Sequence, residues 1–148
     1  MQSIRDRRLI LERQKYPLLE APEAPWDDVL SVTVPAYGLR FELDLMYPFR
    51  QPTAYHKGED VVGALKLKYI TVVQLLRPFN VDFPCICCRI LLSPGRWNPT
   101  HTLEHAVDDL LEWSDALEDI TRFFAFKHRL PFDELVIHKI LQFLIKPK

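Results

Sequence analysis

The most constraining feature of the sequence is a pair of alternating segments with a short turn between them. In residues 39–45 every second residue is apolar, and residues 30–34 show the same alternation. Pro35 and Gly38 lie between the two segments. Successive side chains of a strand point to opposite faces, so a period of two places the apolar residues on one face. The pattern predicts two half-buried strands of one sheet.

Three helices are expected around these strands. Ser3 is placed to cap a helix that ends near Tyr16, because its hydroxyl can accept from the backbone of the first turn. Thr102 and Asp133 are placed to cap two later helices, whose apolar residues recur at helical spacing.

A third strand is expected at residues 65–73, where apolar residues alternate with lysines, and residues 77–89 are expected to be extended or irregular. A helix followed by strands and then by helices predicts an α+β fold. We therefore expect one domain over residues 1–148, with an N-terminal helix, an antiparallel β-meander of about four strands and C-terminal helices.

Charge and cysteine usage narrow the possible functions. The chain of 148 residues has 19 basic and 20 acidic residues, without the basic excess typical of nucleic-acid binding. No apolar run approaches the roughly 20 residues that span a bilayer, so neither nucleic acid nor membrane is an expected partner. The three cysteines, Cys85, Cys87 and Cys88, have no distant partner for a disulfide. This usage predicts a reducing, cytoplasmic location.

Six short pieces of sequence occur in a fixed order along the chain. They are Trp26, Val32-Thr33-Val34-Pro35, Tyr37-Gly38 with Phe41-Glu42-Leu43, Tyr47-Pro48-Phe49 with Pro52, Ile86-Cys87 with Ile90-Leu91, and Trp97-Asn98-Pro99 with Thr102-Leu103. In this order they resemble the ubiquitin-conjugating enzymes, over roughly residues 26–112.

The resemblance implies a ubiquitin-conjugating-like domain with transferase activity. Cys87 would be the nucleophile that carries a ubiquitin-like modifier as a thioester and passes it to an amine or a ligase. Asn80 is the candidate for stabilising the oxyanion or ordering the loop, and Trp97, Asn98 and Pro99 would support the site.

The same resemblance implies the partners. They would be an activating enzyme, a ubiquitin-like protein, and a ligase or protein target, with no cofactor in the conjugating step. The first helix, through Arg5, Arg7 and Arg8, would be the face that meets the activating enzyme.

One part of the family pattern is altered here. The family carries His-Pro-Asn shortly before the cysteine, whereas the equivalent positions here are Arg77-Pro78-Phe79, or a segment shifted by one residue that ends at Asn80. The chain is therefore similar to divergent members, such as the bacterial ubiquitin-conjugating-like proteins. The alternative is a catalytically inactive scaffold of the same fold, in which Cys87 could be buried.

The cysteines and histidines also allow other interpretations. In an extended segment Cys85 and Cys87 would share one face, and Cys88 would point into the core as a small apolar residue. Cys85, Cys87, His101 and His105 could together bind zinc. His101 and His105 also have the spacing of an inverted zinc-protease motif, although the expected helix begins after His101.

Overall fold

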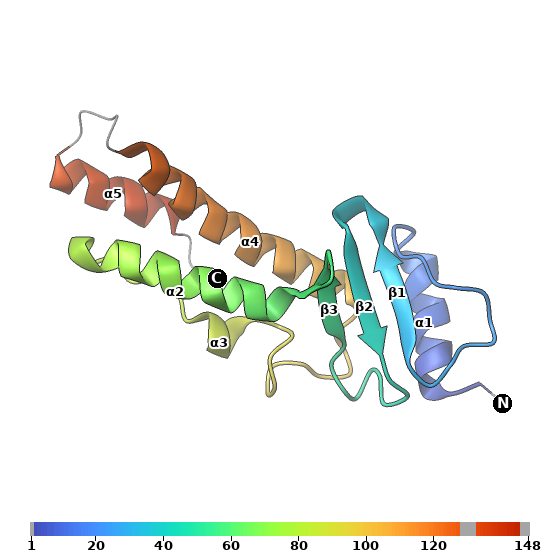
Figure 1. The fold of residues 1–148 in the computed structure, drawn as a ribbon. Coiled ribbons are helices and arrows are strands. Elements are labelled where there is room, and N and C mark those ends of the chain that lie inside the picture. Colours follow the sequence, from blue (N-terminus) through green and yellow to red (C-terminus); the bar gives the residue numbers. More distant parts are fainter. Residues whose placement is uncertain (1, 128–132, 146–148) are drawn as a thin grey trace.

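The computed structural model describes residues 2–127 and 133–145. The elements are α1 (Ile4–Lys15), β1 (Leu30–Val34), β2 (Leu39–Leu43), β3 (Thr53–His56), β4 (Glu59–Asp60), α2 (Val61–Leu76), α3 (Ile86–Arg89), α4 (Leu103–Phe126) and α5 (Glu134–Leu144) (Figure 1). Two 3-10 helices, η1 (Pro35–Tyr37) and η2 (Arg77–Phe79), follow β1 and α2. The chain is α+β, with an N-terminal helix, an antiparallel sheet and C-terminal helices, as the sequence predicts.

The four described strands form an antiparallel meander in the order β1-β2-β3-β4. Val32 of β1 pairs with Phe41 of β2, which pairs with Ala54 of β3, and all three side chains are buried. The alternation in residues 30–34 and 39–43 therefore corresponds to one buried face, which confirms the first two expected strands.

The helices extend the molecule away from the sheet. In Figure 1, α1 lies beside β1 at one end, whereas α2, α4 and α5 form a helical layer that reaches the other end. The long helix α4 contacts both α2 and α5. It buries residues three or four positions apart, namely Leu103, Ala106, Val107, Leu110, Trp113, Leu117 and Ile120.

The helix caps form as the sequence predicts. The Ser3 hydroxyl accepts from the backbone N–H of Asp6, and the Thr102 hydroxyl accepts from that of His105. The Asp133 carboxylate accepts from the backbone N–H of Val136. Among the helices that the structure describes, none is both long enough and apolar enough to cross a membrane.

The strand expected at residues 65–73 is wrong, because this segment lies within helix α2. Asp60 caps the helix, and its carboxylate accepts from the backbone N–H of Val62 at 3.1 Å. Leu65 and Val72 are buried two turns apart, whereas Leu67, which alternation would place beside Leu65, is 70% exposed. The third and fourth strands are β3 and β4, earlier in the chain.

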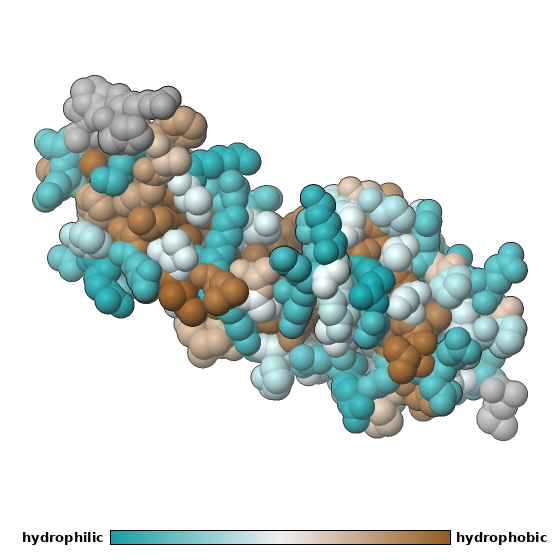
Figure 2. Space-filling model, viewed as in Figure 1, coloured by the Kyte–Doolittle hydropathy of each residue, from teal (hydrophilic) through white to brown (hydrophobic). Residues whose placement is uncertain are grey.

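Hydrophobic side chains remain at the surface of α2. Figure 2 shows hydrophobic residues over the middle of this helix, where the structure leaves Leu67 and Ile70 exposed. The apolar residues of this segment therefore alternate along the sequence, but only those on one face of the helix enter the core.

Helix α1 is attached to the rest of the chain by arginines. The Arg5 side chain is fully buried, and its guanidinium donates to the carbonyl oxygens of Asp27 and Asp28, both at 2.7 Å. Arg8 donates to the carbonyl oxygens of Pro99 and His101, also at 2.7 Å. Two of the three arginines expected to face an activating enzyme therefore serve internal contacts instead.

A buried carboxylate, that of Glu12, joins three distant segments. Its Oε2 accepts a hydrogen bond from the Tyr47 hydroxyl, and its Oε1 accepts from the backbone N–H of Leu103 at 2.6 Å. The Arg8 Nε lies 3.2 Å from the same carboxylate. Burial, followed by the negative charge of Glu12, raises the pKa of Tyr47, so this phenol stays protonated and continues to donate.

Replacing Glu12 by alanine is expected to lower the free energy of unfolding by about 3 kcal/mol, because the Tyr47 hydroxyl and the Leu103 N–H lose their buried acceptor. Urea unfolding followed by circular dichroism measures the change. The matched control is Glu23→Ala in an exposed loop, which should change stability by less than about 0.5 kcal/mol. Equal effects of the two substitutions would contradict the role of Glu12.

Candidate functional site

The three cysteines lie on one short turn of helix. Cys85 is the N-cap of α3, and Cys87 and Cys88 are within that helix. Ile86 and Ile90 are buried one helical turn apart and anchor the opposite side. The turn is helical rather than extended, so the expectation that Cys88 enters the core is wrong. Cys87 and Cys88 are exposed, and Cys85 is half-buried.

The three sulfur atoms are in mutual contact. The Sγ of Cys85 lies 2.8 Å from that of Cys87 and 3.5 Å from that of Cys88. The Sγ atoms of Cys87 and Cys88 are 3.9 Å apart. All three are free thiols. The sequence places these residues close together in the chain, but only the helical turn directs their sulfurs to one point.

The contacts make the three thiols unequal. Hydrogen bonds from the thiols of Cys87 and Cys88, followed by a backbone N–H, lower the pKa of Cys85 to about 7. Hydrogen bonds of the Cys87 thiol to Cys85, and secondly to Cys88, raise the pKa of Cys87 to about 11. Cys85 is therefore the more acidic of these two thiols. Sequence reasoning nominated Cys87 and did not identify this role of Cys85.

A cavity of about 340 Å³ lies between α2 and the segment after η2, and none of the cysteines lines it. Tyr69 of α2 lines this cavity and is also close enough to Cys85 for the two groups to influence each other's ionisation. Burial, followed by the charge of Cys85, raises the pKa of Tyr69, which keeps the phenol protonated. The Tyr69 ring packs against Phe83, which in turn packs against the buried Trp113, with ring centroids 6.0 and 6.1 Å apart. The rings of Phe83 and Trp113 thus connect Tyr69 to the core.

Asn80 lines the same cavity as Tyr69. It follows η2 with a φ of 53°, in the left-handed region that asparagine tolerates, and its backbone N–H donates to the carbonyl of Arg77 at 3.1 Å. Its side chain is exposed and makes no described hydrogen bond to a cysteine. Phe79, just before it, packs against Phe124 of α4 with ring centroids 5.7 Å apart. Asn80 therefore shares a cavity with Tyr69, but no described hydrogen bond connects it to the sulfurs.

The segment Trp97, Asn98 and Pro99 contacts a different loop. The Trp97 indole donates to the carbonyl oxygen of Pro48 at 2.8 Å, and its ring packs against Tyr47 with centroids 6.1 Å apart. The Asn98 side chain accepts from the backbone N–H of Thr100 at 2.9 Å, as in a turn. Within residues 2–127 and 133–145, no hydrogen bond or ring contact joins this segment to the cysteines. Any support it gives the site is therefore indirect.

The histidines do not join the cysteines. The Nδ1 of His101 accepts from the backbone N–H of Asn98, and that of His105 accepts from the backbone N–H of Thr102. His101 lies before α4, so the protease-like pair does not share a helix. Among the described residues, the three cysteines alone form a group of metal-ligand atoms within 4.8 Å of one another. The zinc set of two cysteines and two histidines, considered as an alternative from the sequence, is therefore not formed among the described residues.

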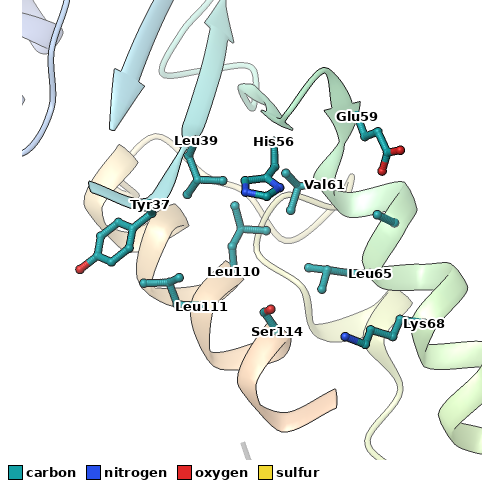
Figure 3. Close-up of a pocket in the computed structure, with 11 residues that line it drawn as sticks. Tyr37, Leu39, His56, Glu59, Val61, Leu65, Lys68, Leu110, Leu111 and Ser114 are labelled. Atoms are coloured by element: carbon teal, nitrogen blue, oxygen red, sulfur yellow. The ribbon is translucent and has the colours of Figure 1, made fainter. Parts of the chain in front are cut away.

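A second cavity, of about 280 Å³, lies between the sheet and the helices. Figure 3 shows Leu39 and His56 from the strands facing Leu65 of α2 and Leu110 of α4 across it. Its wall includes Lys68, which forms an ion pair with Glu118. None of the cysteines lines this cavity. Sequence reasoning did not identify it, since its lining residues come from six separate elements.

Comparison with known proteins adds no family assignment. No protein-family model, curated protein or solved structure matches the chain. The fold and the cysteine cluster, together with the sequence resemblance, are therefore the observations on which a functional proposal rests.

Iodoacetamide at pH 7 is expected to alkylate Cys85 before Cys87, because Cys85 is about half ionised there. Mass-spectrometric fragmentation of the modified peptide assigns the site. Replacing Cys87 by alanine removes the main hydrogen-bond donor to Cys85, so the pH midpoint of Cys85 alkylation should rise from about 7. Cys88→Ala is the matched control and should raise it less. A midpoint that stays unchanged in Cys87→Ala would show that the thiols do not interact.

Proposed function

We propose that the protein is a divergent ubiquitin-conjugating-like enzyme that carries a ubiquitin-like modifier as a thioester on Cys87. In this proposal the modifier arrives from an activating enzyme and leaves to an amine or to a ligase. The proposal joins the sequence resemblance to the geometry of the cysteine turn.

The exposure of Cys87 is the observation that carries the proposal. A thioester-forming cysteine must be reached by a second protein, whereas a scaffold could bury the same side chain without loss. Cys87 is exposed at the surface, while its neighbour Ile86 is buried and anchors the turn. A short anchored turn holds the sulfur in place and keeps it accessible.

A contact between two of the six short sequence pieces supports a ubiquitin-conjugating-like fold. Trp97 bonds to Pro48 and packs against Tyr47, so the Tyr47-Pro48-Phe49 and Trp97-Asn98-Pro99 pieces meet in space. They are about fifty residues apart in the chain. Pieces that belong to one structural pattern are expected to be close in this manner. The helix η2 and the long α2 before it are departures from the family pattern.

The chemistry requires a proton acceptor for the attacking thiol. When the Cys87 sulfur attacks the carbonyl carbon of the incoming thioester, its S–H proton passes to Cys85, whose Sγ lies 2.8 Å away. The cysteine of the activating enzyme then leaves as a thiolate and takes up a proton from solvent. The carbonyl is bonded to Cys87 at the end of the step, with no oxidant or cofactor consumed.

The surface proposed to contact the activating enzyme differs from the one expected from the sequence, because Arg5 is buried and Arg8 forms hydrogen bonds within the chain. Arg7, Leu11 and Lys15 of α1 remain exposed and supply one apolar and two basic side chains. We assign the contact with the activating enzyme to this exposed side of α1.

A thioester assay tests the proposal. Wild-type protein, ATP, a panel of ubiquitin-like proteins and their activating enzymes should give an adduct that reductant removes. Cys87→Ser should give no such adduct, or one that resists reductant, because an oxyester replaces the thioester. Cys85→Ala removes both the proton acceptor and the contact that raises the pKa of Cys87, so its rate of thioester formation should keep rising with pH above 7, where the wild-type rate levels off because Cys85 is already ionised. Non-reducing gels followed over time measure both effects.

Cys88→Ala is the matched control, since Cys88 is neither the nucleophile nor the proton acceptor, and it should still form the adduct. An oxyester on Cys85→Ser in place of Cys87→Ser would overturn the assignment of the nucleophile. Absence of an adduct with every activating enzyme and modifier of the panel would favour the inactive scaffold. The packing of Phe79 against Phe124, where the family carries an asparagine, is the observation that favours this alternative.

A further inference from the structure

We propose that Cys85, Cys87 and Cys88 form a binding site for one thiophilic metal ion, held by three thiolates. This inference goes beyond conjugation and does not depend on it. It concerns a different ligand set from the two cysteines and two histidines considered from the sequence, since the histidines are absent from the group.

The sulfur positions suit a single ion. Three thiolates at ~2.3 Å from one zinc ion lie about 3.8 Å from one another in tetrahedral geometry. Cys87 and Cys88 are at 3.9 Å, and Cys85 and Cys88 are at 3.5 Å. The pair Cys85 and Cys87, at 2.8 Å, would open by ~1 Å on binding. The exposed Cys87 side chain can make such a change by rotating about χ1.

The site is largely formed before any ion binds. Ile86 and Ile90 hold the turn from below, with a 2.9 Å hydrogen bond between their backbone groups. Just beyond them, the backbone N–H of Leu91 donates to the Asp109 carboxylate of α4 at 2.8 Å. The chain is thereby fixed on the far side of the turn, so binding requires little ordering of the backbone.

The donor set selects the kind of ion. Thiolates are soft ligands that favour Zn²⁺ and Cu⁺ over Mg²⁺ or Ca²⁺, which prefer oxygen. In the described part of the chain, no histidine, carboxylate or further cysteine joins these three cysteines as a fourth ligand. A three-coordinate Cu⁺ needs no further ligand, and Zn²⁺ would complete its shell with water. The exposure of Cys87 and Cys88 gives the ion a direct path from solvent.

Metal binding would use the same sulfurs as the proposed thioester. An ion held by all three thiolates leaves no lone thiol for attack, so the two states exclude one another. Zinc or copper would therefore inhibit thioester formation, although binding itself can be measured without modifier or activating enzyme.

The test is a titration of the reduced protein with Co²⁺, Zn²⁺ or Cu⁺, each alone. Co²⁺ should give a sulfur-to-metal charge-transfer absorption that saturates at one equivalent of metal. Zn²⁺ should then displace the Co²⁺ and abolish this absorption. X-ray absorption of the zinc form should show three sulfur neighbours. Competition with a chromophoric chelator gives the affinity, and each of Cys85→Ser, Cys87→Ser and Cys88→Ser should weaken it at least about tenfold.

The double variant His101→Ala, His105→Ala is the control and should bind as tightly as wild type, because neither histidine belongs to the group. Far-UV circular dichroism establishes that each serine variant is folded before its affinity is compared. Fewer than three sulfurs around zinc, or an affinity that the serine substitutions leave unchanged, would overturn the proposal. A failed thioester assay together with intact three-sulfur binding would reject conjugation alone.

Discussion

The carboxylate of Glu12 is the contact on which the arrangement of the N-terminal half depends. A buried carboxylate is unfavourable unless hydrogen bonds and opposite charge replace its water. Glu12 obtains these from Tyr47, from the backbone of Leu103 and from Arg8, which belong to a loop, to the first turn of α4 and to α1 itself. Displacing α1 would leave the Tyr47 hydroxyl and the Leu103 N–H without their acceptor, and displacing either of those groups would leave Glu12 with one donor fewer, so the three segments stabilise one another's positions. The Tyr47 loop in turn receives the Trp97 side chain, which fixes the segment leading into α4.

The cysteine site follows a different principle, because local structure creates it. The turn of α3 buries Ile86 and Ile90 and thereby presents the three sulfurs on the opposite side. Helical geometry brings together residues three apart, so the sulfurs of Cys85 and Cys88 meet as well as those of Cys85 and Cys87. Three thiols in contact cannot behave alike, since a thiolate at one sulfur is stabilised by thiol donors at the other two. The proposed transfer of a modifier and the proposed binding of a metal ion would use the same three sulfur atoms, so the two would compete.

Much of the fold was predictable, and the errors share a cause. Ser3, Thr102 and Asp133 cap helices because a cap depends on a few neighbouring residues. The strands at 30–34 and 39–43 were predictable because strict alternation of apolar and polar residues leaves a helix without an apolar face. The segment 65–73 was mistaken for a strand since its apolar residues fit both a period of two and a helical face. Only contact of Leu65 and Val72 with the core decides between them, and that contact comes from distant parts of the chain.

The sequence by itself determined the helix caps, the first two strands, the α+β class and the grouping of three cysteines in one short segment. These depend on residues close together in the chain, where spacing and chemistry are sufficient. Tertiary structure decided that Arg5 is internal, that the histidines stay apart from the cysteines, and that Cys88 faces solvent. Each of these outcomes depends on which side of an element is buried. That choice is made by the packing of elements far apart in sequence, because burial of apolar surface is a property of the whole fold.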